Sequence, residues 1–266
     1  MSPTTLFYFS GTGNSLAFAC RLAERSDGVL VPMTRALTGN AGPVSNRIGL
    51  VFPTFAYGLP RTVKDFVARV VLPAGAYILG VASCCGIPGG VLHHLDRALR
   101  ARGHQLDAGF AVCDPRSSLT EDPAESPIQR LMIAANRGRK PPSSHQRLDE
   151  IADHLRFARP HPIEGSGLVV DAMGSVLHRL AAKSFPASAQ HFWTTDACSG
   201  CGTCTRLCPR ANVTLEERRP SWGADCDLCH ACIQWCPRQA IQFKDLTSDK
   251  PRYHHAEVGV QAMLQR

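Results

Sequence analysis

Residues 5–15, TLFYFSGTGNS, decide the fold of the first half of the chain. Residues 5–10 form an apolar run that predicts a short β-strand, and a glycine-rich turn follows it directly. Residues 14–25 then place apolar side chains at helical spacing. A strand, a turn and a helix in this order predict the first unit of an α/β fold, with the turn at the carboxyl end of the strand.

Further short apolar runs alternate with helical patterns along the first half of the chain. Strands that are apolar throughout and separated by helices predict an open parallel sheet with helices on both faces. We expect the last helix, residues 168–182, to cover the sheet. The other expected strands are residues 29–31, 48–52, 77–82 and 110–113, and the other expected helices are residues 60–70, 91–102, 128–136 and 148–157.

The turn after the first strand carries three hydroxyl side chains, one amide side chain and two glycines. Glycines let backbone N–H groups close around an anion, and the start of a helix adds a favourable dipole. The turn contains neither G-x-x-x-x-G-K-S/T nor G-x-G-x-x-G, which argues against a Walker-type or dinucleotide site. A plain strand-to-helix turn is the alternative. The candidate phosphate-binding residues are Ser10, Gly11, Thr12, Gly13, Asn14 and Ser15.

The turn fits the pattern Ser/Thr-x-Thr-Gly-x-Ser/Thr of the flavodoxin phosphate loop, and the first half of the chain resembles that family. The resemblance implies a flavodoxin-like fold whose phosphate loop binds FMN. It also implies that two further loops lie beside the isoalloxazine ring, with Phe55 or Tyr57 stacked on it, although either aromatic side chain can instead fold back onto the core. The residues of these two loops are Pro53, Thr54, Phe55, Ala56 and Tyr57, and Ser83, Cys84, Cys85 and Gly86.

Eight of the 12 cysteines lie in two copies of the pattern C-x2-C-x2-C-x3-C-P, 28 residues apart. In each copy, three cysteines at this spacing wrap one loop around an iron–sulfur cube, and the fourth, before a proline, reaches the other cube. Zinc is the alternative, but zinc sites favour four ligands from two C-x2-C pairs. The predicted ligand sets are Cys198, Cys201, Cys204 and Cys236 for the first cluster, and Cys226, Cys229, Cys232 and Cys208 for the second.

This duplicated pattern resembles the bacterial dicluster ferredoxins, which implies two 4Fe-4S clusters in a small α+β domain. The order of the two parts resembles the flavodoxin–ferredoxin fusion family, often called EFR-type ferredoxins, and residues 191–193, 220–222 and 232–241 add to the likeness. We expect a flavodoxin-like FMN-binding domain over residues 1–183. Residues 184–266 are then a linker, a ferredoxin domain over residues 198–243 and a C-terminal tail.

A chain that binds FMN and two clusters can convert between one-electron and two-electron carriers. We therefore expect electron transfer between FMN and the clusters, and on to a redox partner protein or a small electron acceptor. No catalytic acid–base set or organic substrate is identifiable, so the sequence favours an oxidoreductase without naming catalytic residues. An oxygen- or redox-sensing iron–sulfur regulatory protein, a flavodoxin fold that has lost FMN, and a homodimer stay open.

The composition is that of an ordinary globular protein, with 44% hydrophobic and 19% charged residues. The formal net charge of +7 is weak evidence for nucleic-acid binding, because no recognised nucleic-acid-binding motif accompanies it. The longest uncharged stretch, residues 70–95, contains two prolines and five glycines, which favours a strand with loops over a membrane span. With no secretion signal, we expect a cytoplasmic protein, where thiols stay reduced.

Overall fold

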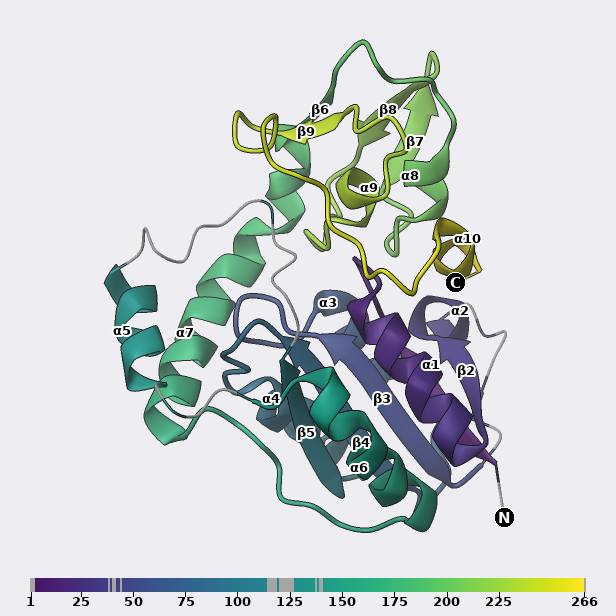
Figure 1. Ribbon diagram of the computed structural model, residues 1–266, viewed down its shortest axis with the longest axis vertical. Helices are drawn as coiled ribbons and strands as arrows, with labels where there is room; N and C mark the ends of the chain where they lie inside the picture. Colours follow the sequence, from purple (N-terminus) through teal and green to yellow (C-terminus); the bar gives the residue numbers. More distant parts are fainter. Residues whose placement is uncertain are drawn as a thin grey trace.

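The computed structural model describes residues 3–37, 39, 42–43, 45–113, 119, 127–136, 138 and 141–265. Its first half is built on a five-stranded sheet in the order β2-β1-β3-β4-β5, with every neighbouring pair parallel (Figure 1). This strand order is that of flavodoxin-like sheets, and the predicted open parallel α/β sheet is confirmed. The strands are β1 (Thr4–Tyr8), β2 (Gly28–Pro32), β3 (Arg47–Pro53), β4 (Tyr77–Cys84) and β5 (Ala108–Cys113).

Helices cover both faces of this sheet, as the apolar strands predict. In and just after β1, Leu6 and Tyr8 face one hydrophobic core, whereas Phe7 and Phe9 face the other, because successive side chains of a strand point to opposite faces. The first core includes side chains of α1 (Asn14–Ser26) and α6 (Ser144–Phe157). The second includes side chains of α3 (Arg61–Arg69) and α4 (Val91–Arg100), and α2 (Met33–Leu37) follows β2.

The helix α7 (Leu168–Ser184) does not cover the sheet, so this expectation was wrong. α1 and α6 cover one face of the sheet and α3 and α4 cover the other, and α7 lies beside α5 (Pro127–Ala135) and reaches toward the second half (Figure 1). Its apolar side chains are largely exposed: Leu168 at 91% and Leu180 at 63%. α7 contacts the loop after β3 instead, where His178 Nδ1 lies 3.0 Å from the carbonyl oxygen of Phe55.

The second half contains two short antiparallel strand pairs and two four-residue helices, drawn in green and yellow at the top of Figure 1. The 28-residue sequence repeat is also a backbone repeat: Gly202 and His230, immediately before the two short helices, have φ angles of 72° and 61°. The elements are η1 (Pro186–His191), β6 (Phe192–Thr194), α8 (Thr203–Arg206), β7 (Val213–Glu216), β8 (Arg219–Trp222), α9 (Ala231–Gln234), β9 (Ile241–Phe243) and α10 (Val260–Leu264).

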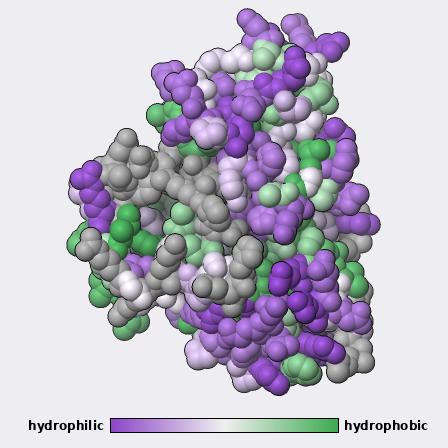
Figure 2. Space-filling view, viewed as in Figure 1, coloured by the Kyte–Doolittle hydropathy of each residue, from purple (hydrophilic) through white to green (hydrophobic). Residues whose placement is uncertain are grey.

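Hydrophilic residues are spread over both halves on the face that Figure 2 shows, with apolar residues scattered among them. Among the helices that the structure describes, none has the length and apolar character that crossing a membrane requires.

Candidate functional site

The predicted phosphate loop lies at the carboxyl end of β1 and starts α1. Gly13 has a φ of 101°, a left-handed conformation that favours glycine, and its N–H donates to Ser10 Oγ at 3.1 Å. The hydroxyls of Ser15 and Ser83 lie 2.9 Å apart, which joins this loop to the end of β4. Ser10 and Ser15 are each only 1% exposed, so the loop is a buried feature of the molecule.

The second half of the chain binds the carbonyl side of this loop. The indole Nε1 of Trp235 donates to the Gly11 carbonyl oxygen at 3.0 Å, and the His255 N–H donates to the Thr12 carbonyl oxygen at 3.0 Å. The Tyr253 hydroxyl donates to Asn14 Oδ1 at 2.9 Å. The cysteine-bearing half and the C-terminal tail therefore both rest on the predicted phosphate loop.

Apart from the Gly13 N–H, most backbone donors of the same described loop have no partner. Within the described residues, the N–H groups of Gly11, Thr12, Asn14 and Ser15 meet no acceptor. Buried backbone donors without an acceptor are costly and rare, and a row of them at a helix start suits an anion. The loop therefore fits a phosphate group. Its carbonyl oxygens at Gly11 and Thr12 already accept hydrogen bonds from the second half, whereas the four N–H groups named above can still donate to an anion.

Gly11 lies against the second cysteine run. A Cβ atom on Gly11 would lie 2.3 Å from the Cys229 carbonyl oxygen, so no other residue fits without a shift of the backbone. The sequence indicates a glycine here for anion binding only. The structure adds a second requirement, the close approach of a chain segment more than two hundred residues away.

The loop after β3 makes a tight turn. Phe55 and Gly58 exchange both backbone hydrogen bonds, at 3.1 and 3.0 Å, and Ala56 and Tyr57 have φ angles of 44° and 67°. Positive φ at residues other than glycine is strained and is concentrated at functional sites. Thr54 donates its N–H to the Ser83 carbonyl oxygen at 2.8 Å, so Pro53 and Thr54 join the two predicted ring loops.

The predicted stacking side chains both have protein neighbours. The Phe55 ring lies edge-on to Phe9, with centroids 6.0 Å apart. Tyr57 lies between Gly89 and Gly174, close enough that a Cβ atom on either glycine would come within about 3 Å of its own Cβ. Stacking of either ring on a flavin stays a prediction. The buried Thr54 Oγ1, which has no hydrogen-bond partner among the described residues, is a polar atom that a ligand at these loops would satisfy.

The other predicted ring loop begins at the end of β4. Cys84 is buried, Cys85 is exposed, and Gly86 has a φ of 99°. Cys84 is paired in register with Cys113 on β5. The loop thus lies at the same edge of the sheet as the phosphate loop, where open α/β sheets bind their ligands.

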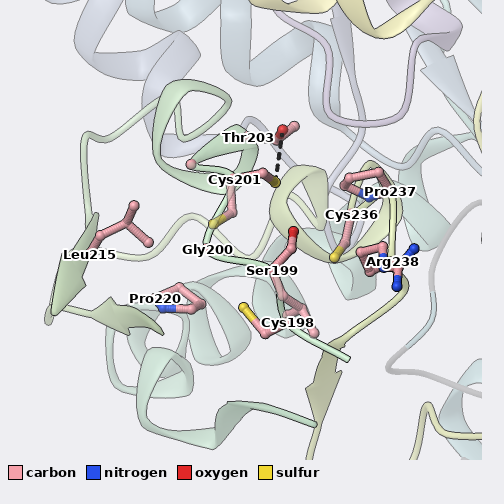
Figure 3. A pocket seen from close by; sticks show the side chains of 13 residues that line it. Cys198, Ser199, Gly200, Cys201, Thr203, Leu215, Pro220, Cys236, Pro237 and Arg238 are labelled. Carbon is pink, nitrogen blue, oxygen red and sulfur yellow. Dashed lines mark hydrogen bonds between the residues drawn. The ribbon is translucent and has the colours of Figure 1, made fainter. Parts of the chain in front are cut away.

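The first predicted cysteine set surrounds one cavity of about 340 Å³, part of it open to solvent. Figure 3 shows Cys198, Cys201 and Cys236 around this space, and Cys204 also lines it. Cys201 is exposed, and the Thr203 hydroxyl, 3.4 Å from its sulfur, lowers the pKa of its thiol. Burial raises the pKa of Cys204 to about 11.

The four cysteines of the second predicted set are all half-buried, and none of them is as exposed as Cys201. Burial, with Cys208 and Cys226 close by, raises the pKa of the Cys229 thiol. Burial and the nearby thiols of Cys229, Cys226 and Cys208 raise that of Cys232 well above its usual value. Cys208 belongs to the first run in sequence but lies with the second run in space, as the predicted exchange of the fourth cysteine requires.

The cysteines that line the cavity, and those that lie close to Cys208, coincide with the two predicted sets, and their role as cluster ligands stays a prediction. No three His, Cys, Asp or Glu side chains within the described part of the chain converge in a way that would hold a single metal ion. Thiolates that bind separate irons at the corners of a cube do not need to converge on one point.

A buried carboxylate joins the second run to the sheet half. Asp227, between Cys226 and Cys229, accepts the Arg61 N–H at 3.2 Å and the Thr62 N–H at 3.0 Å. It thereby caps the start of α3 from the other half of the chain. Burial raises the pKa of Asp227 against these hydrogen bonds, which act in the opposite direction. Sequence analysis missed this residue, because an aspartate between two cysteines carries no signal of a distant helix.

An ion-pair network lies beside this cap. Arg210 contacts Asp65 at 2.5 Å and Asp225 at 2.8 Å, and Arg61 contacts Asp225 at 2.7 Å. Arg61 and Asp65 belong to α3, whereas Arg210 and Asp225 follow the first cysteine run and precede the second. The network therefore fixes the cysteine-bearing half on the same helix that Asp227 caps.

Comparison with known proteins gives little beyond this geometry. No protein-family model matches the chain. One similar protein is the uncharacterized protein MJ1349 of Methanocaldococcus jannaschii, which is 39% identical over 51 residues. The match covers 19% of this chain and 14% of that protein, so the chain spans only a small part of the relative's length.

Proposed function

We propose that this chain is an electron-transfer protein of the flavodoxin–ferredoxin fusion type. FMN would bind at the phosphate loop and the two loops after β3 and β4. Two 4Fe-4S clusters would be held by the cysteine sets Cys198, Cys201, Cys204 and Cys236, and Cys226, Cys229, Cys232 and Cys208. FMN supplies one- and two-electron chemistry and the clusters supply one-electron chemistry.

The contact between the second cysteine run and the phosphate loop carries this proposal. Gly11 touches the backbone of Cys229, and the Trp235 indole N–H donates to the Gly11 carbonyl oxygen. If the two halves did not exchange electrons, such a close approach between them would not be needed. The same contact makes a short protein path between the buried cluster and a cofactor on the loop.

The burial of the two cysteine sets suggests an order for the electrons. The first set lines a cavity that is partly open, and its Cys201 is exposed. The cysteines of the second set are half-buried, and Cys229 packs against the cores of the sheet half. We therefore place the external partner, a redox protein or a small acceptor, at the first cluster, with the second cluster between it and the flavin.

Anaerobic reconstitution followed by stopped-flow reduction tests the proposal. The loaded protein should contain about eight irons and one FMN, and the flavin absorbance should bleach after the cluster absorbance when a reduced ferredoxin is the donor. Cys201→Ser, which removes a ligand of the first cluster, should slow the bleaching of the flavin at least tenfold. Cys20→Ser is the matched control, because Cys20 lies on α1 outside both sets.

Three results would count against the proposal. Clusters without bound flavin would favour the iron–sulfur sensor or a flavodoxin fold that has lost FMN. Flavin without iron would remove the electron path altogether. Equal flavin bleaching in Cys201→Ser and in the Cys20→Ser control would mean that electrons do not enter through the first cluster.

A further inference from the structure

Two hydrogen bonds between described residues join the C-terminal tail to the predicted phosphate loop, and they differ in kind. The His255 N–H donates to the Thr12 carbonyl oxygen at 3.0 Å, a contact between two backbones. The Tyr253 hydroxyl donates to Asn14 Oδ1 at 2.9 Å, a contact between two side chains that are 239 residues apart in the sequence. Tyr253 therefore acts on the amide side chain of a candidate phosphate-binding residue.

The protein uses only one end of the Asn14 amide. Asn14 is 8% exposed and is the first residue of α1, beside the backbone N–H groups that meet no acceptor. Tyr253 occupies the amide oxygen, whereas the Nδ2 group meets no acceptor within the described part of the chain. The oxygen and the nitrogen of an amide point in different directions, so a donor on Oδ1 leaves Nδ2 facing away from Tyr253.

Tyr253 is itself held by the second cysteine run. Its N–H donates to Gln234 Oε1 at 2.7 Å, and Gln234, in α9 between the last two cysteines of that run, is 2% exposed. The following residues also pair, because the His254 ring stacks on the Trp235 indole with centroids 4.6 Å apart and planes 17° from parallel. A side chain on a backbone held in this way loses little further conformational freedom when its hydroxyl makes a hydrogen bond.

We propose that Tyr253 is a positioning residue of the FMN site, whose hydroxyl holds Asn14 Oδ1 so that Asn14 Nδ2 is presented to the phosphate as a donor. The inference rests on the proposed binding of FMN at this loop. An asparagine amide has two orientations, one of which turns its oxygen toward the anion. By donating to that oxygen, Tyr253 favours the other orientation. A donor that is oriented before the ligand arrives binds more tightly, because less ordering is needed on binding.

The test compares FMN with riboflavin, which lacks only the phosphate, on the reconstituted full-length protein. The variants Tyr253→Phe and Tyr77→Phe each keep the aromatic ring and remove one hydroxyl. Tyr77 is the matched control, because its hydroxyl donates to the Arg159 carbonyl oxygen at 2.6 Å, outside the phosphate loop. In titrations followed by flavin fluorescence, Tyr253→Phe should weaken FMN binding about threefold to tenfold and leave riboflavin binding unchanged. Tyr77→Phe should change neither affinity.

A double-mutant cycle identifies the residue through which Tyr253 acts. Asn14→Ala should weaken the binding of FMN more than that of riboflavin. Adding Tyr253→Phe to it should cause no further loss, because the two side chains form one interaction. Equal losses of FMN and riboflavin affinity in Tyr253→Phe, an unchanged FMN affinity, or losses that add in the double variant would overturn the inference while the FMN site stands. A wild-type protein that binds neither flavin would overturn the proposed function as well.

A measurement on the wild type does not depend on the folding of Tyr253→Phe. In protein labelled with ¹⁵N-asparagine, the Asn14→Ala variant identifies the side-chain resonances of Asn14 by their loss. At saturating ligand, these resonances should shift with FMN, and riboflavin should not reproduce the shift. Equal shifts with both flavins would show that Asn14 Nδ2 does not face the phosphate, which also overturns the inference.

Discussion

At the scale of single residues, the predicted phosphate loop presents its carbonyl oxygens and its N–H groups to different surroundings. Its carbonyl oxygens at Gly11 and Thr12 accept hydrogen bonds from the second half, while the N–H groups of the same two residues meet no acceptor within the described part of the chain. A peptide unit points its donor and its acceptor in opposite directions, so one loop satisfies both without competition. Gly11 is the residue at which this arrangement is tightest, because the Cys229 backbone occupies the place of a side chain.

Gly11→Ala should therefore weaken the contact between the halves. The added Cβ would lie 2.3 Å from a backbone oxygen, and overpacking of this kind costs about 1–3 kcal/mol. We expect a lower free energy of unfolding in urea and a lower affinity for FMN. Gly42→Ala is the control, because a Cβ there meets no atom within 4 Å. Equal stability and FMN affinity in Gly11→Ala and the control would show that the close approach is not needed.

At the scale of elements, α3 shows how the two halves depend on each other. The sequence predicts a helix over residues 60–70 with a proline in its first turn. The helix begins at Arg61, with Pro60 at the N-cap position, where no side chain of its own accepts a hydrogen bond. Asp227 supplies that acceptor from the other half, so the first turn of α3 is complete only in the docked molecule.

α7 contacts the sheet half through polar side chains as well as through its buried residues Val170 and Gly174. His94 on α4 lies 2.8 Å from the Ser175 hydroxyl, and the rings of His94 and His178 have centroids 5.9 Å apart. Burial, followed by the nearby charges of His178 and Arg97, lowers the pKa of His94 to about 4. The contact between α4 and α7 therefore requires neutral histidines.

The free energy of unfolding should consequently decrease as the pH falls through a defined window. The unfolded chain protonates this histidine below about pH 6.5, whereas the folded chain resists protonation down to about pH 4. The unfolding free energy should therefore decrease as the pH falls from about 6.5 to 4, with no further loss from this group below that. His94→Gln, which keeps a hydrogen-bonding side chain, should flatten the profile of urea unfolding in this window. His104→Gln, outside this contact, should not, and equal slopes for both variants would refute the assignment.

At the scale of the whole molecule, charges on the two halves are paired across their contact. Arg210 has a side chain only 14% exposed and bridges Asp65 on α3 and Asp225 before the second cysteine run. The side chains of Asp65 and Asp225 are 35% and 46% exposed. This exposure lowers both the free-energy cost of burying the carboxylates and the strength of their ion pairs. A network that shares one guanidinium between the halves should make them unfold together.

Arg210→Gln should separate this cooperative unfolding into two steps. We expect one calorimetric transition in the wild type, and two in the variant, with the less stable half losing about 1–3 kcal/mol. Arg100→Gln is the control, because the Arg100 side chain is largely exposed and its pair with Asp96 joins two positions of one helix, which contributes about 0.5 kcal/mol or less. A single transition at an unchanged temperature in Arg210→Gln would show that other contacts hold the halves together.

The sequence by itself determined the features that repeat over a short distance. Strands that are apolar throughout predict burial on both faces of the sheet, and the structure has a hydrophobic core on each face. The phosphate-binding turn and the two cluster ligand sets, with the exchange of Cys208 and Cys236, also follow from short-range spacing, and their binding roles stay predictions. These are consequences of strand, turn and loop geometry, which operates over a few residues.

Only the tertiary structure decided how these units meet. Thr62 and Asp227 are separated by 165 residues, Gly11 and Trp235 by 224, and no local pattern marks either pair. The predicted place of α7 was wrong for the same reason: its helical period is evident in the sequence, but helices from elsewhere in the chain cover both faces of the sheet. Short-range geometry determines the helices and strands. Their arrangement depends on which apolar and polar surfaces pack together, and those surfaces come from distant parts of the chain.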